Sequence, residues 1–199
     1  MSMSISYEEH GRTRQKARTR AALLEATREL LAAGASPTVE DAAALAGVSR
    51  ATAYRYFPNQ RALLVAAHPE VEAASLLGDD APADLQARLE RAVRELVRLT
   101  LDTEPELRAM LRISLESEAT QELVLRRGRA IGWLHDALAP LEGVLPEREL
   151  RHLVLAIRTA CGIEALVWLT DVAGLSRPQA AEQMRWSALA LLRGATRDA

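Results

Sequence analysis

The 199-residue chain has few of the residues that build disulfides, metal sites and catalytic centres. Its single cysteine, Cys161, lies in an apolar stretch, so we expect a buried structural thiol and no disulfide within the chain. Its histidines do not form the i, i+4 pair of helical zinc sites, and neither a glycine-rich phosphate loop nor a nucleophile elbow is present. We therefore predict no catalytic residues, no metal and no cofactor, and we do not expect an enzyme.

Aromatic residues make up only 4% of the sequence, with one phenylalanine, whereas 49% of the residues are hydrophobic. Leucine and alanine must therefore fill most of the core, which is typical of all-helical proteins. No stretch of about 18 consecutive apolar residues predicts a membrane span, and the amino terminus lacks the apolar segment of a signal peptide. The low cysteine content also fits a reducing cytosol, so we expect a cytoplasmic protein.

The net charge of −2 is unevenly distributed along the chain. Residues 1–62 carry nine basic and six acidic residues, a net charge of +3, which leaves −5 for the remainder. A basic amino-terminal part followed by an acidic remainder suits a protein that contacts phosphates at one end only. An ordinary solvated surface is the alternative explanation of the same pattern. Over 1–17 we predict a flexible basic arm that reaches DNA phosphates or a minor groove, the alternative being a solubilising tail. The predicted contact residues of this arm are Arg12, Arg14, Lys16 and Arg18.

Apolar residues recur at helical spacing along most of the chain, and no strand-like alternation is present. The pattern predicts an all-α fold with a small three-helix domain over 18–64 and a helical bundle over 65–199. About nine helices are predicted in total: 18–33, 38–46, 50–56, from 60 to a break at 68–69, 83–103, 105–116, 120–138, 147–172, and a last one ending near 193.

A helix-turn-helix is predicted within the three-helix domain, a unit that places its second helix in the major groove of DNA. Thr38 and Asp41 have the spacing of a capping box at the start of the first helix. Gly47 permits the backbone conformation that the short turn needs. Ala53 and Phe57 lie four residues apart on the second helix and are expected to face the core.

The other side chains of the second helix, 50–56, suit contacts with DNA. Arginine bonds guanine bidentately, alanine and threonine methyl groups contact thymine, and tyrosine hydroxyls bond phosphate oxygens. Ser49 and Asn59 are expected to cap this helix and the next one. The alternative is an ordinary helical hairpin whose aromatic residues pack inside.

Several segments of this region together resemble the signature of the TetR family of bacterial repressors. They are the TVED of 38–41, the AGVS of 46–49 and the YRYFPN of 54–59, followed by the two leucines of 63–64. The resemblance covers roughly 18–66, in order and without gaps. It implies that the amino-terminal domain binds DNA and that the rest of the chain is an all-helical domain for effector binding and dimerisation.

The resemblance also implies a role for individual residues. Thr38 resembles a phosphate-contacting cap, arginines occupy base-facing positions, and tyrosines occupy positions that contact the DNA backbone. The family usually has lysine where this chain has Gln60, whose neutral amide can bond a phosphate but releases no counterion, so we expect a shallower salt dependence of binding. The predicted DNA-contacting residues are Thr38, Ser49, Arg50, Ala51, Thr52, Tyr54, Arg55, Tyr56 and Gln60.

The last two helices carry an apolar stripe at helical spacing, and the resemblance implies that they form the interface of a homodimer. Tryptophan and methionine in the middle helices would suit the pocket of a hydrophobic or amphipathic effector. The alternative for both sets is plain core packing. Predicted interface residues are Leu153, Ile157, Cys161, Ala165, Trp168, Met184, Ala188 and Leu191. Predicted pocket residues are Met110, Ile113, Ser114, Trp133, Leu134 and Trp168.

These expectations combine into one function. The sequence predicts a homodimeric transcriptional repressor that binds a palindromic operator in double-stranded DNA and is released by a small-molecule effector. Two alternatives remain open: a helical ligand-binding or scaffolding dimer that does not bind DNA, and a transcriptional activator.

Overall fold

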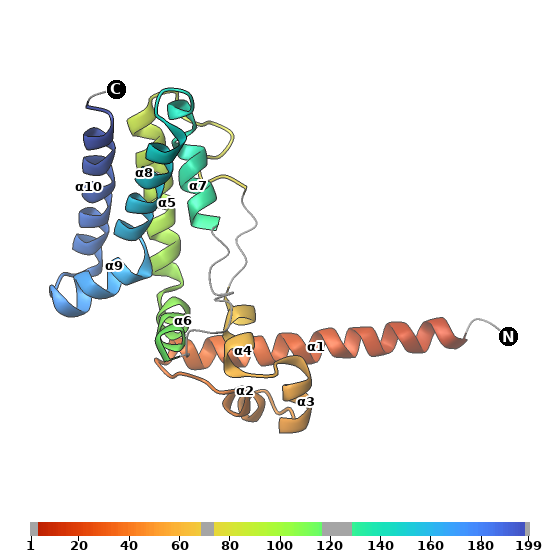
Figure 1. Ribbon diagram of the computed structural model, residues 1–199. Helices are drawn as coiled ribbons and strands as arrows, with labels where there is room; N and C mark the ends of the chain where they lie inside the picture. Colours follow the sequence, from red (N-terminus) through yellow and green to blue (C-terminus); the bar gives the residue numbers. More distant parts are fainter. Residues whose placement is uncertain (1–3, 69–73, 117–128, 198–199) are drawn as a thin grey trace. The chain divides into compact units, whose positions relative to one another are not determined.

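The computed structural model describes residues 4–68, 74–116 and 129–197, and the chain is helical in nearly all of these ranges (Figure 1). Besides α-helices, the described residues form one 3₁₀ turn, one π-helical turn and an isolated bridge between Glu142 and Leu145. The predicted all-α fold class is confirmed. The chain divides into two compact units: unit 1 is Met1–Pro69 with Pro105–Ser117, and unit 2 is Glu70–Glu104 with Glu118–Ala199.

The first helix of unit 1 is longer than the sequence predicted. Helix α1 spans Ser4–Ala32, so it begins well before the expected start near Arg18 and includes most of the stretch predicted to be a flexible arm. The reason is local: the added residues contain no proline and are rich in glutamate, arginine, glutamine and lysine, all of which favour helices. Gly34, with a φ of 80°, follows its carboxyl end, as expected.

Unit 1 also contains three short helices: α2 (Val39–Leu45), α3 (Arg50–Tyr56) and α4 (Gln60–Ala67). Helices α2 and α4 pack against α1, and α3 packs against α2. In Figure 1 they lie beside the carboxyl-terminal half of α1. Their contacts bury a shared hydrophobic core. This core includes Ala53 and Phe57, the two side chains that were predicted to face inward. The core residues are Leu23, Leu24, Val39, Ala42, Ala43, Ala53, Phe57, Leu63 and Ala67.

Unit 2 is a helical bundle built from four main helices. These are α5 (Leu85–Asp102), α7 (Arg129–Ala137), α8 (Glu147–Ala160) and α10 (Arg177–Ala195), and each packs against at least one of the others. Of the helix predicted over 120–138, the part after residue 128 is α7, and the rest lies outside the described residues. The chain between α5 and this part contains α6 (Glu104–Glu116), which is grouped with unit 1 except for its first residue.

The long helix predicted over 147–172 is interrupted. Helix α8 ends at Ala160, Gly162 is extended, and the chain continues as α9 (Ile163–Val167) and a π-helical turn (Trp168–Val172). Glycine is the weakest helix former apart from proline, which favours a break at this position.

This interrupted stretch also bears on the expectation that the chain has no membrane span. Among the described residues, Glu147–Val172 is long and apolar enough to cross a membrane by length and composition. Part of this stretch, however, is used in the core: Leu153, Val154 and Ile157 are at most 5% exposed. Packing of this kind is what the core helix of a soluble protein shows, so the stretch is weak support for a membrane segment.

Polar contacts between distant segments fix the bundle of unit 2. Glu104, 5% exposed, accepts two hydrogen bonds from the Arg177 guanidinium, at 2.7 and 3.0 Å. Glu90 of α5 accepts one from Arg185 of α10, at 2.7 Å. Cys161 is fully buried, and this burial raises the pKa of its thiol to about 12, so the expectation of a structural rather than a reactive thiol is confirmed.

Candidate nucleic-acid interface

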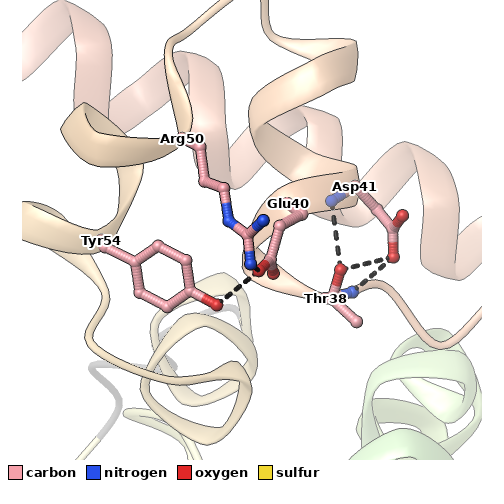
Figure 2. Close-up of polar contacts among 5 residues, drawn as sticks. All are labelled: Thr38, Glu40, Asp41, Arg50 and Tyr54. Carbon is pink, nitrogen blue, oxygen red and sulfur yellow. Dashed lines mark hydrogen bonds and ion pairs between the residues drawn. The ribbon is translucent and has the colours of Figure 1, made fainter.

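The start of α2 has the predicted capping box. The Asp41 backbone N–H donates to Thr38 Oγ1 at 3.2 Å, and the Asp41 carboxylate accepts from both the backbone N–H and the hydroxyl of Thr38, at 2.8 and 2.7 Å (Figure 2). These hydrogen bonds lower the pKa of Asp41. The first turn of α2 is therefore held in one conformation, and its exposed N-cap is fixed.

The turn between α2 and α3 also follows the sequence prediction. Gly47 has a φ of 64°, the left-handed conformation that favours glycine, and Val48 packs on the core of unit 1. Ser49 caps α3 by accepting from the Thr52 N–H, and Asn59 caps α4 by accepting from the Ala62 N–H. Local hydrogen bonds thus set where each helix of the motif begins.

Helix α3 divides into a buried side and an exposed side. Ala53 and the following Phe57 are buried, at 0% and 3% exposed, so the core holds the helix. The exposed side chains are those predicted to face DNA: Arg50, Ala51, Tyr54 and Arg55, with Thr52 and Tyr56 half-buried beside them. A helix held by its inner face and polar on its outer face is suited to insertion into a major groove.

Glu40 of α2 is a functional candidate that the sequence analysis missed. Its Oε1 atom accepts a hydrogen bond from the Tyr54 hydroxyl at 2.7 Å and also contacts Nη2 of Arg50 (Figure 2). Mainly through the hydrogen bond from Tyr54, the pKa of Glu40 is lowered and that of Tyr54 is raised. No local pattern marks this residue, because only the crossing of α2 and α3 brings the three side chains together.

Gln60 has a different environment from the one its predicted phosphate contact requires. Its side-chain N–H₂ group donates to the Pro37 carbonyl at 3.0 Å and lies within 3.3–3.4 Å of the carbonyl and hydroxyl of Ser36. The amide donors are therefore directed into unit 1, where they hold the loop that precedes Thr38. A phosphate contact by this amide would require it to leave these partners, and its lack of charge is unchanged.

The basic residues predicted as an arm lie on α1. Arg14, Lys16 and Arg18 are exposed on this helix, and the side chain of Arg12 lies outside the described residues. Next to them, the Arg20 guanidinium stands over the Phe57 ring, 5.8 Å from its centroid. These charges are displayed by a helix rather than by a flexible segment.

The residues predicted to line a pocket do not share one environment. Met110, Trp133 and Leu134 are buried, whereas Trp168 is 57% exposed on its π-helical turn. Those of α6 belong to unit 1, and those of α7 belong to unit 2. Two surface hollows described for this chain lie along α10, and one of them is lined by Trp186, Ser187, Ala190, Leu191, Gly194 and Ala195.

Most residues predicted at a dimer interface are buried within the single chain. Their exposed fraction is at most 5%, so they form the core of unit 2, because the most apolar stripe of α8 and α10 packs inward. These core residues are Leu153, Ile157, Cys161, Met184 and Ala188. Ala165 and Leu191 are half-buried, and Trp168 is exposed. The exposed large apolar side chains of the same helices also include Leu155, Val172 and Trp186.

The geometry of unit 1 defines a class of protein: a helix-turn-helix DNA-binding protein, with a short capped helix displayed on a three-helix core. Residues 23–67 match the family model described as "Bacterial regulatory proteins, tetR family". The matched range runs from the second half of α1 to the end of α4. The predicted resemblance is thereby confirmed: the chain carries the TetR-family domain of a DNA-binding transcription regulator. No curated protein matches the chain.

Proposed function

We propose that the protein is a homodimeric transcriptional repressor that binds a palindromic operator and is released by a small-molecule effector. The observation that supports DNA binding is the exposed face of α3, which carries Arg50, Tyr54 and Arg55. The opposite face of the same helix is held by the core. The family match supports the same reading at the level of a DNA-binding regulator.

The exposed side chains of α3 divide by chemistry into base readers and backbone contacts. Arg50 and Arg55 can each bond the O6 and N7 atoms of guanine, and Ala51 and Thr52 can contact a thymine methyl group. Hydroxyls at the start of the motif, such as that of Thr38, suit phosphate oxygens. The cations of α1 add contacts of the kind that depend on salt and not on sequence.

Dimerisation is supported by the apolar side chains that unit 2 leaves in solvent. Trp168, Val172 and Trp186 are 57–70% exposed, and large apolar side chains left in solvent are typical of an interface. A twofold dimer places two copies of α3 on one DNA duplex. The operator is therefore expected to be an approximate palindrome, with half-sites about one helical turn apart or a multiple of it.

Release by an effector requires two conformations of the dimer that bind DNA with different affinity. A ligand shifts the population toward the weaker DNA-binding form only if it binds that form more tightly. Trp133 of unit 2 is our candidate for contact with a hydrophobic or amphipathic ligand, because its side chain is large and apolar. This part of the proposal rests on the resemblance and on the residue types.

A selection experiment tests the proposed function. The full chain is incubated with a pool of randomised DNA duplexes at low salt, bound duplexes are amplified, and the mass of the protein is measured by sedimentation equilibrium. We expect enrichment of an inverted repeat and the mass of a dimer. Recovery of random sequences by a folded dimer would contradict sequence-specific binding, and enrichment of a single, non-repeated site by a monomer would contradict the dimer.

A further inference from the structure

Glu40 places a negative charge among the side chains proposed to contact DNA. It is the second residue of α2, directly before Asp41, whose capping box fixes this turn. Its side chain is 33% exposed, and that of its ionic partner Arg50 is 73% exposed. A carboxylate at this surface would be repelled by DNA phosphates, so its position needs an explanation beyond the stability of the fold.

One oxygen atom of Glu40 connects two residues of α3. Oε1 accepts from the Tyr54 hydroxyl at 2.7 Å and contacts Nη2 of Arg50, and the Arg50 guanidinium lies 5.9 Å from the centre of the Tyr54 ring. The three side chains therefore form a closed cluster in which each touches the other two (Figure 2). Arg50 meets Glu40 through Nη2, and its Nε and Nη1 atoms also carry N–H donors.

Arg50 has two ways to meet a DNA duplex, and Glu40 affects them differently. If Arg50 stays on Glu40, its remaining N–H groups can bond acceptors on a base edge, such as O6 and N7 of guanine. If Arg50 turns to a phosphate, which every sequence offers, it must leave Glu40. The carboxylate then loses its cation close to the negatively charged backbone, which opposes this second mode.

We propose that Glu40 is a specificity-determining positioning residue, which holds Arg50 and Tyr54 in the base-reading arrangement and weakens binding to non-cognate DNA. This inference rests on the proposed DNA-binding function and adds to it a residue that disfavours binding to the wrong sequence. Specificity is a difference between two affinities, so a group that disfavours the wrong duplex raises it as effectively as a new contact with the right one. Glu40 thus acts through Arg50 and does not itself need to touch a base.

The test compares wild type with Glu40→Gln on two duplexes: one selected from a random pool by the wild-type protein, and a scrambled duplex of the same composition. Glutamine keeps the size and one acceptor oxygen but removes the charge. For the scrambled duplex we expect tighter binding, by about tenfold at 0.1 M salt, and a salt slope steeper by about one unit, as for one added phosphate contact. For the selected duplex the affinity should stay the same or fall, so the ratio of the two affinities drops.

Two further variants separate positioning from a general effect of charge or folding. Glu25→Gln removes the same charge from α1, where Glu25 is 77% exposed and pairs with Arg28, so its affinity ratio should remain within twofold of wild type. In an Arg50→Ala background, Glu40→Gln should no longer change the ratio, because the residue it positions is gone. Thermal melting confirms that each variant is folded.

Four results would overturn the inference. An unchanged ratio in Glu40→Gln, or an equal drop in Glu25→Gln, would show that Glu40 has no positioning role. A drop that persists in the Arg50→Ala background would show that Glu40 acts by another route. If wild type itself fails to distinguish the selected from the scrambled duplex, the proposed function fails together with the inference, whereas the other three results leave that function intact.

Discussion

Helices α2 and α10 begin with the same local device in two different units. In both, the side chain three residues after the N-cap accepts from the backbone N–H and the hydroxyl of the cap: Asp41 from Thr38 at 2.8 and 2.7 Å, and Gln179 from Ser176 at 2.9 and 2.8 Å. In unit 1 this capping box lies at the start of the helix-turn-helix, whose exposed residues could be predicted from the sequence. In unit 2 it lies at the start of α10, whose exposed residues could not be predicted from the sequence.

The difference lies in what selects the exposed residues. On α3, buried Ala53 and Phe57 fix the orientation of a seven-residue helix, so the remaining positions must face outward. On α10, apolar residues occur on more than one side, and only the packing of α5 and α8 decides which side is buried. A short helix within a compact motif therefore reveals its surface in the sequence, whereas a long helix in a bundle does so only through its neighbours.

The largest expected effect concerns the exposed side of unit 2. Trp186 is 60% exposed, and if it lies in the dimer interface, Trp186→Glu would bury an unpaired charge there. We expect a loss of about 2–4 kcal/mol of association free energy, typical of an interface hot spot, and a monomeric mass at micromolar concentration by sedimentation. The matched control is Val144→Glu, at a site that is 59% exposed outside the helices, and this variant should remain a dimer. Equal dissociation of both variants would contradict the assignment.

A smaller effect compares the two caps directly. Replacing Thr38 or Ser176 by alanine removes the hydroxyl of the cap, and each change should lower the free energy of unfolding by about 0.5–2 kcal/mol, as measured by urea denaturation. We expect the larger loss for Thr38, because its partner is a charged carboxylate near the start of a helix and Gln179 is neutral. A larger loss for Ser176 would contradict this ranking.

The same pair predicts a pH dependence. The pKa of Asp41 is lowered in the folded chain by its hydrogen bonds from Thr38, so its stabilising contribution is present above the ordinary value of 3.8 and is lost as the pH falls through the lower folded value. The loss of unfolding free energy caused by Thr38→Ala should therefore become smaller below about pH 4 and approach the loss caused by Ser176→Ala. Gln179 does not titrate, so the loss caused by Ser176→Ala should change little over the same range.

The sequence predicted the helix-turn-helix residue by residue because its signals are local. The helix bounds of α3, the caps at Thr38, Ser49 and Asn59, and the left-handed Gly47 all agree with the pattern. These features depend on hydrogen bonds between residues no more than five apart, so neighbouring residue types suffice to predict them.

The remaining features depend on contacts between residues that are distant in sequence. Glu40 meets Arg50 across ten residues, and Gln60 meets the loop of Ser36 and Pro37 across more than twenty. The buried positions of Ile157 and Met184 likewise depend on how the bundle packs. Amphipathic patterns show that a residue is apolar but do not distinguish a core from an interface, so the sequence alone could not decide between the two for Ile157 and Met184.

One measurement tests the central claim, that the outer face of α3 reads DNA sequence. The affinities of wild type and Arg55→Ala are measured by fluorescence anisotropy, at one salt concentration, for the selected duplex and for its scrambled counterpart. If Arg55 bonds a base, the substitution should weaken binding to the selected duplex by about 1–3 kcal/mol more than binding to the scrambled one, and the preference at one base pair should relax. An equal loss on both duplexes would contradict base reading by this residue and reduce its role to a phosphate contact.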